Sequence, residues 1–409
     1  MHRSKTALVL AGGGVAGAAY EIGALCAIDQ ALEQLSVNEF DCYVGTSAGG
    51  MIAASLANNI SPRTLLSVLE HSLLGIAQLE PQHLFSVDPT DLLRRVVRLP
   101  AALASAARRI VLEGGQASLL DLVEVLAVSL PSGLYDTSSL ERYLRAALTA
   151  PGRSNRFKDL PHELVIVATE LDSGERAVFG APPLDEVPIS LAVCASAAIP
   201  LFYRPVRIAG RDYIDGGIRG TASLDVAIER GAELIVCINP MVPFDNSRHQ
   251  PGQGISDEGV QRIGNQVFRT FVHAGLHYHI KQVRRRHPHV DILLIEPTRD
   301  DQVMFAHHAM RYRTRMTIAR HGFETVARHL QEHFAHYRGM LARHGVAISD
   351  ERISHDLRTL ANAGDDVRAV RAALVSDGSL HSAPAGLAHT LAELDRLLNR
   401  IEDASPQAA

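Results

Sequence analysis

Short apolar runs and longer helical patterns alternate along most of this chain. The apolar runs predict buried strands at 6–10, 40–46, 163–171, 233–238 and 290–295. Helical patterns span about 18–35, 188–198, 258–286 and 311–343, and a further one begins directly after residue 47. Strands and helices that alternate in this way are typical of an α/β fold. The pattern therefore predicts a mainly parallel central sheet.

The clearest chemical signal lies where the second apolar run ends. Residues 45–49 read Gly-Thr-Ser-Ala-Gly, and an Ala-rich helical pattern follows at once. A serine on a sharp strand-to-helix turn has a strained backbone, and Gly45 and Gly49 leave room for it. The N–H groups at the start of the next helix point to where an oxyanion would form. The spacing favours Ser47 as a nucleophile, with a plain turn as the alternative.

A glycine-rich segment follows the first predicted strand and admits two interpretations. Gly12, Gly14 and Gly17 match Gly-x-Gly-x-x-Gly, the fingerprint of a dinucleotide-binding loop. Such a loop needs an acidic residue at the end of the second strand, whereas Asp41 lies at the beginning of that strand. The other interpretation is a loop whose backbone N–H groups face an anion, at the same sheet edge as Ser47. The sequence favours this second interpretation, and we expect no organic cofactor.

A serine nucleophile needs a base, and the sequence offers an aspartate and many histidines. Asp215 ends a short apolar segment, and Gly216 and Gly217 after it leave the carboxylate accessible; a simple turn aspartate is the alternative. Twenty histidines are present, and Asp215 with a later histidine would fit one order of a Ser-Asp-His triad. Two observations count against a triad. The nucleophile comes on the second strand, and the twelve histidines of residues 262–345 lie among arginines rather than in glycine-flanked loops.

Four segments resemble, in their order along the chain, the motifs of the patatin-like phospholipases: residues 12–17, 45–49, 195–200 and 215–217. The resemblance covers residues 5–240. It implies a three-layer α/β/α patatin-like fold with a mainly parallel central sheet, plus a helical C-terminal extension. Ala16 departs from the family pattern, in which a basic residue is usual at that position.

The resemblance also implies a role for each motif. Ser47 is the nucleophile and Asp215 the proton acceptor of a dyad without histidine, and no metal takes part. The remaining motif residues are the glycines. Gly12, Gly13 and Gly14 form the oxyanion hole, and Gly45, Gly49, Gly216 and Gly217 support the motifs.

The function implied by the resemblance is that of a serine lipid acyl hydrolase, similar to phospholipase A or lysophospholipase. It would cleave carboxylic esters of lipids through an acyl-enzyme intermediate. Partial burial would raise the pKa of Asp215 above the usual value of about 3.9 and make it a better base. The alternative is a catalytically silent lipid-binding or scaffolding protein that retains the fold. The intact Ser47 and Asp215 count against that alternative.

Composition bears on the partners and the compartment of the protein. The 409 residues carry a net charge of −5, which indicates no particular partner. The four cysteines lie in apolar contexts without Cys-x-x-Cys spacing, so they predict buried thiols in a reducing compartment rather than a metal site. The basic N-terminal run and the small apolar residues after it are similar to a secretory signal peptide, but cleavage near Ala18 would remove the first strand and the glycine segment. The longest apolar stretch, 189–203, is too short to span a membrane. We therefore expect a cytoplasmic protein.

The C-terminal part of the chain carries no motif. We expect a catalytic domain over 1–345, with the motifs in 5–240 and a basic helical extension over 241–345, and then a helical tail over 346–409. Residues 262–345 contain fourteen Lys and Arg against six Asp and Glu. This excess indicates either a solvated surface or peripheral contact with anionic membrane lipid. Aromatic residues are not interleaved as in nucleic-acid binders, so we expect no nucleic acid.

Within the tail, apolar residues recur at 387, 391, 394, 398 and 401. Steps of four and three place them on one face of a helix. The pattern extends over about two heptads, which favours docking on the protein's own domain or a weak self-association.

Overall fold

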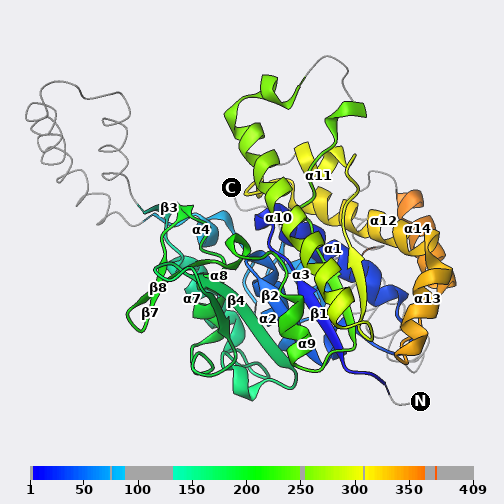
Figure 1. The fold of residues 1–409 in the computed structure, drawn as a ribbon, viewed down its shortest axis with the longest axis horizontal. Helices are drawn as coiled ribbons and strands as arrows, with labels where there is room; N and C mark the ends of the chain where they lie inside the picture. The colour runs from blue at the N-terminus through cyan, green and yellow to red at the C-terminus, as the bar shows by residue number, and fades with distance from the viewer. Residues whose placement is uncertain are drawn as a thin grey trace, which may run out of the picture.

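A sheet covered by helices on both faces forms the centre of the molecule (Figure 1). The computed structural model describes residues 3–73, 76–87, 132–248, 254–306, 309–363 and 374. The strands are β1 (Thr6–Leu10), β2 (Cys42–Thr46), β3 (Gly133–Tyr135), β4 (Glu163–Glu170), β5 (Arg176–Phe179), β6 (Leu201–Tyr203), β7 (Val206–Ile208), β8 (Arg211–Asp215), β9 (Leu234–Ile238) and β10 (Asp291–Ile295). The α-helices are α1 (Gly14–Ala31), α2 (Ala48–Ala57), α3 (Pro62–Val68), α4 (Pro81–Leu84), α7 (Ser138–Leu148), α8 (Ile189–Ser196), α9 (Leu224–Glu229), α10 (Val260–Arg286), α11 (Gln302–Ala306), α12 (Arg315–Glu332), α13 (Phe334–Arg343) and α14 (Asp350–Ala363).

Within the described residues, the main sheet has eight strands. Seven of them follow the order β10-β9-β1-β2-β4-β8-β7, and β5 also pairs with β4. The first five strands of this order are parallel neighbours, whereas β5, β7 and β8 pair in the antiparallel sense. The α/β fold with a mainly parallel sheet that the sequence predicts is confirmed, and helices follow it toward the C-terminus.

Both faces of the central strands are buried, which explains why their sequences lack polar alternation. In β1, Leu8 and Leu10 belong to the core that includes α1, α2 and α12. Ala7 and Val9 belong to a second core, to which α9 and α10 contribute. The sheet is therefore the middle layer of three.

The helices of one outer layer approach each other closely where they carry glycine. α1 and α12 pack together, and a Cβ on Gly23 would lie only 1.9 Å from the carbonyl oxygen of Ala319. A Cβ on Gly322 would lie 2.5 Å from the carbonyl oxygen of Tyr20. α14 packs against the same pair, with Ile353 in the shared core.

Because β1, β2, β9 and β10 run parallel, the residues that follow them meet at one edge of the sheet. This edge receives the glycine segment after β1 and Ser47 after β2. In the described part of the chain, no helix is both long and apolar enough to cross a membrane. The apolar pattern of the tail at 387–401 lies outside the described residues.

Candidate active site

Ser47 occupies a sharp turn between β2 and α2. Its backbone has φ 55° and ψ −127°, a combination that costs a non-glycine residue roughly 1–3 kcal/mol. The flanking glycines make the turn possible. A Cβ on Gly45 would lie 2.7 Å from the carbonyl oxygen of Gly49, and a Cβ on Gly49 would lie 2.5 Å from that of Leu10. The strained serine turn that the sequence predicts is confirmed.

Ser196, at the end of α8, holds the backbone of this turn. The N–H of Ser47 donates to Ser196 Oγ at 2.7 Å, and the Ser196 hydroxyl donates to the carbonyl of Val167 at 2.6 Å. The chain of hydrogen bonds ties the turn to β4. Ser196 lies in segment 195–200, which carries the family resemblance, but nothing in its local pattern indicates this partner.

Asp215 ends β8 and is buried, with 5% of its surface exposed. Its Oδ1 accepts a hydrogen bond from the N–H of Gly217 at 2.7 Å. Its backbone is held by the carbonyl of Ala198 at 3.0 Å and by the hydroxyl of Thr169 at 3.2 Å. Gly216 cannot carry a side chain here, because a Cβ would lie 2.3 Å from a β4 carbonyl oxygen. The backbone of Asp215 is therefore fixed by two other segments, and its carboxyl by the N–H of Gly217.

Burial raises the pKa of Asp215 to about 6, against the opposing effects of the nearby Ser47 hydroxyl and of the Gly217 N–H. Oδ2 is buried and has no hydrogen-bond partner among the described residues. The Ser47 hydroxyl is thus near the carboxyl without forming a hydrogen bond to Oδ2, as is common at catalytic sites without substrate. Oδ2 remains available to take a proton.

The glycine segment lies directly against Ser47. A Cβ on Gly12 would be 2.8 Å from Ser47 Cβ, and a Cβ on Gly13 would be 2.7 Å from Pro240 Cγ. Gly14 has φ +62° and lies against the carbonyl of Ala309. Within the described residues, the N–H groups of Gly13 and Gly14 have no acceptor. The segment thus brings two unused donors to the serine.

Ala16, where the family usually has a basic residue, is buried in the first turns of α1. Its N–H donates to the carbonyl of Ala309 at 2.9 Å. A long charged side chain would have to displace the packing around this position. The Ala16 side chain instead belongs to the hydrophobic core that includes α1 and α2.

A cavity of about 440 Å³ brings these residues together. Ser47, Asp215 and the glycines 12–14 lie in its wall. Most of the remaining wall is apolar and includes Ile199, Leu201, Phe202, Ile218, Phe268 and Met310. No histidine is found among the described residues that line it. The residues 307 and 308, both histidines, precede the lining residue Ala309 and lie outside the described part.

The geometry can be compared with known protein families. The model of the family described as patatin-like phospholipase matches residues 8–228, more than half of the chain. The chain belongs to the patatin-like phospholipase family. The match includes Ser47, Asp215 and the glycine segment, and the family assignment predicted from the four motifs is confirmed. Membership in this family indicates a lipid acyl hydrolase.

Comparisons with individual proteins give weaker similarities. A search of curated proteins finds no match. Among solved structures, the chain is similar to VipD from Legionella pneumophila, with 16% identity, 98% of this chain and 87% of VipD covered, and a TM-score of 0.34. It is also similar to the type III effector protein ExoU, with 13% identity, 97% and 70% coverage, and a TM-score of 0.31. A structure of ExoU from Pseudomonas aeruginosa with SpcU gives 15% identity, 94% and 72% coverage, and a TM-score of 0.30. Similarities at this level carry no information on function.

Proposed function

We propose that this patatin-like phospholipase cleaves carboxylic esters of lipids through a Ser47–Asp215 dyad and an acyl-enzyme intermediate. One observation supports the proposal best. A strained serine and a buried carboxyl line one largely apolar cavity, beside glycines with unused N–H groups. The chain thus combines a nucleophile, a base, oxyanion donors and an apolar binding space.

In the proposed reaction, Ser47 Oγ attacks the ester carbonyl carbon while its proton passes to Asp215 Oδ2. The raised pKa of Asp215 favours this transfer, because a carboxylate of ordinary pKa holds a proton too weakly near neutral pH. The protonated Asp215 then donates to the oxygen of the leaving alcohol. Water attacks the acyl-enzyme with Asp215 again as the base, which releases the fatty acid and restores the serine.

The negative oxygen of the tetrahedral intermediate needs donors that are in place beforehand. The N–H groups of Gly13 and Gly14 supply them, and Gly12 keeps the approach to Ser47 free of side-chain atoms. Both donors lie at the N-terminus of α1, where the helix dipole favours negative charge. This arrangement supports an oxyanion hole at residues 12–14 rather than a dinucleotide site.

The apolar wall supports a lipid as the substrate, of the phospholipase A or lysophospholipase type. A volume of about 440 Å³ is within the range of small-molecule sites. A second, smaller apolar pocket shares Ser47 and Gly14 with the cavity and extends toward Leu69 and Leu84. An acyl chain bound along these walls would place its ester at Ser47.

The second candidate function is that of a catalytically silent lipid-binding or scaffolding protein. Reaction with a fluorophosphonate probe separates the two, because the probe phosphonylates only an activated serine. We expect one equivalent of label on the peptide that contains Ser47, and no label on the Ser47→Ala variant. Absence of label from the folded wild-type protein would favour the silent alternative.

The pH dependence of hydrolysis provides an independent prediction. Asp215 must be ionised to act as a base, so kcat/KM should fall about tenfold per pH unit below a midpoint near 6 and be constant above it. Glu21 is the matched control, since burial also raises the pKa of this carboxyl, near Ala11. The Glu21→Gln variant should keep the midpoint of the wild type. A midpoint near 4, or one that moves in Glu21→Gln, would contradict the assignment of Asp215.

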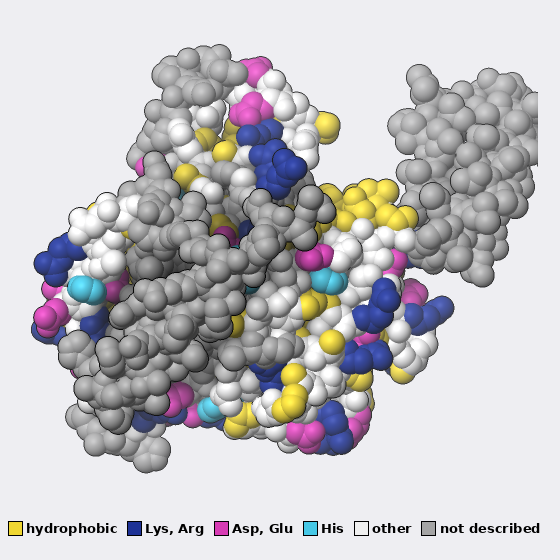
Figure 2. All heavy atoms as spheres, turned by 180° about the vertical axis from the view of Figure 1, so that it is seen from behind, with side chains coloured by type: hydrophobic (Ala, Val, Ile, Leu, Met, Phe, Trp, Pro, Cys, Tyr) yellow, Lys and Arg dark blue, Asp and Glu magenta, His cyan; other side chains and the backbone are white. Residues whose placement is uncertain are grey.

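Peripheral contact with lipid is the remaining part of the proposal, and α10 offers the surface for it. Val260, Val267 and Phe271 share one face of this helix and are exposed by 86%, 61% and 66%. Phe268, on the adjoining side of the helix, lines the cavity. On the face of the molecule that Figure 2 shows, seen from behind, basic and acidic side chains are interspersed. We propose that this apolar face of α10 meets the membrane.

A further inference from the structure

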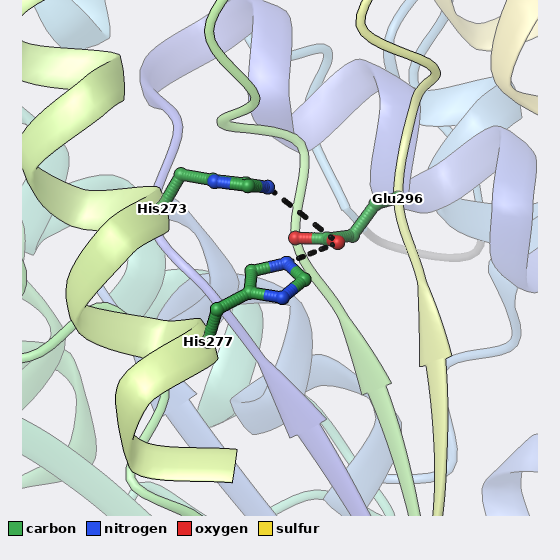
Figure 3. A group of neighbouring side chains, drawn as sticks. All are labelled: His273, His277 and Glu296. Atoms are coloured by element: carbon green, nitrogen blue, oxygen red, sulfur yellow. Dashed lines mark hydrogen bonds and ion pairs between the residues drawn. The ribbon is translucent and has the colours of Figure 1, made fainter. Parts of the chain in front are cut away.

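Two histidines and a glutamate converge at the edge of the sheet, outside the cavity wall. His273 and His277 lie one turn apart on α10, and Glu296 follows the last residue of β10. Figure 3 shows both imidazole rings directed toward the Glu296 carboxylate. Nε2 of His277 is 2.9 Å from Glu296 Oε2, and Nε2 of His273 is 3.9 Å from the same oxygen. The three ligand atoms all lie within 4.8 Å of one another.

We propose that His273, His277 and Glu296 bind a Zn²⁺ ion. Donor atoms around tetrahedral zinc are about 3.3–3.6 Å apart, given metal–ligand distances of about 2.0–2.2 Å. The two separations from the histidine nitrogens to Glu296 Oε2 lie on either side of this range, so small side-chain rotations would complete the site. Two imidazoles and one carboxylate are a donor set suited to zinc, with water in the fourth position. Magnesium and calcium prefer oxygen donors only.

The carboxylate is oriented for this role by a second residue. The side-chain amide of Asn239 donates to Glu296 Oε1 at 2.6 Å, which leaves Oε2 facing the histidines. Asn239 is fully buried and accepts from the N–H of Met241 at 3.1 Å, so its own orientation is fixed. Outer hydrogen bonds of this kind are typical of metal sites and fix the ligand geometry. An isolated surface ion pair does not need them.

A site of this kind must also be accessible to the ion. The side chain of His277 is 47% exposed, whereas those of His273 and Glu296 are 21% and 14% exposed. The pair of histidines is four residues apart on one helix, which already places both rings on the same face. Glu296 comes from a different element, and only the parallel pairing of β10 with β9 brings it next to Asn239. The site uses histidines, unlike the cysteines from which the sequence predicts no metal site.

The bound ion would fasten α10 to the sheet. Val272, next to His273, lines the cavity, and Pro240, next to Asn239, packs against Gly13. A second anchor lies one turn earlier, where the buried Arg269 guanidinium donates to the carbonyl of Met304 at 2.8 Å. Zinc would thus hold the helix that forms one wall of the cavity, apart from the Ser47 chemistry.

The test is a zinc titration of the metal-free full-length protein in competition with a chromophoric chelator. We expect one tight equivalent of Zn²⁺ and no comparable binding of Mg²⁺. Co²⁺ in its place should give the visible absorption bands of a tetrahedral site. Glu296→Gln removes the charge but keeps an oxygen that can accept from Asn239, and His277→Gln changes a half-exposed ring. Each variant should weaken zinc binding by at least about 10-fold.

A second histidine pair provides the matched control. His329 and His333 are also four residues apart, on α12 and at its end, with ring centroids 4.5 Å apart and no carboxylate in a cluster with them among the described residues. The His333→Gln variant should bind zinc like the wild type. Added zinc should raise the thermal midpoint of the wild type and of His333→Gln but not that of His277→Gln. The proposal is overturned if wild-type binding is no tighter than that of His277→Gln, or if His333→Gln loses as much.

Discussion

Replacement of Ser47 by alanine is expected to lower the rate of ester hydrolysis by about 10⁴-fold or more, the scale seen when a serine hydrolase loses its nucleophile. The substitution removes one hydroxyl and no backbone contact. The N–H of residue 47 would still donate to Ser196, and alanine adopts the φ of 55° no less readily than serine. Hydrolysis of a short-chain nitrophenyl ester by the purified variant measures the effect.

Ser55 supplies a matched serine-to-alanine control on α2. Its hydroxyl donates to the carbonyl of Met51 at 2.8 Å within the same helix, and it does not line the cavity. The Ser55→Ala variant should hydrolyse the ester at nearly the wild-type rate. If Ser47→Ala does the same, another residue is the nucleophile.

The five parallel strands of the central sheet could be predicted from the sequence to within two residues at either end. Continuous apolar runs bounded by polar or glycine-rich segments gave β1 and β9 to within one residue at either end. This was possible because a strand covered on both faces has a continuous apolar sequence, without alternating polar residues. The order of the strands in the sheet could not be derived in the same way, since pairing depends on contacts between segments far apart in the chain.

Helix boundaries were predicted less well, for local reasons. The sequence predicts the first helix over about 18–35, but α1 spans Gly14–Ala31. Glycines suggest a loop, yet the helix starts at Gly14, and it stops where Leu32 turns to an extended conformation. The segment 311–343 was predicted as one helix, whereas α12 ends at Glu332 and α13 begins at Phe334. His333 between them leaves the helical geometry.

The residues of the candidate site also differ in how well they could be predicted from the sequence. Ser47 could be found because its strained turn needs glycines at fixed neighbouring positions, a signal contained within five residues. Ser196 and Thr169, which hold the backbones of Ser47 and Asp215, carry no such signal, because each acts through a hydrogen bond to a segment distant in sequence. Glu296 is a similar case, since its histidine partners lie on another element.

Replacement of Asp215 by asparagine is expected to lower the rate of ester hydrolysis by at least about 10²-fold, on the scale of general-base catalysis. Asparagine keeps an oxygen for the N–H of Gly217 but cannot accept the proton of Ser47. Rates of the variant and the wild type, compared above pH 7 where the carboxyl is ionised, measure the effect.

Stability distinguishes this loss from unfolding. A carboxyl whose native pKa is raised from 3.8 to about 6 binds protons more tightly in the folded than in the unfolded state, so its contribution to stability falls as the pH rises through this interval. Above pH 6 the ionised Asp215 therefore lowers the free energy of unfolding by about 3 kcal/mol. Asp215→Asn removes this destabilising buried charge, so the variant should unfold at the same or a higher temperature than the wild type at pH 8.

Histidine variants complete the experiment. A dyad predicts that no single His→Ala change lowers the rate as much as Asp215→Asn. His307 and His308 are the most informative positions, because they directly precede Ala309, which lines the cavity. If one of them matched the loss of Asp215→Asn in a folded protein, a Ser-His-Asp triad would replace the dyad, with Asp215 orienting the imidazole rather than accepting the proton of Ser47.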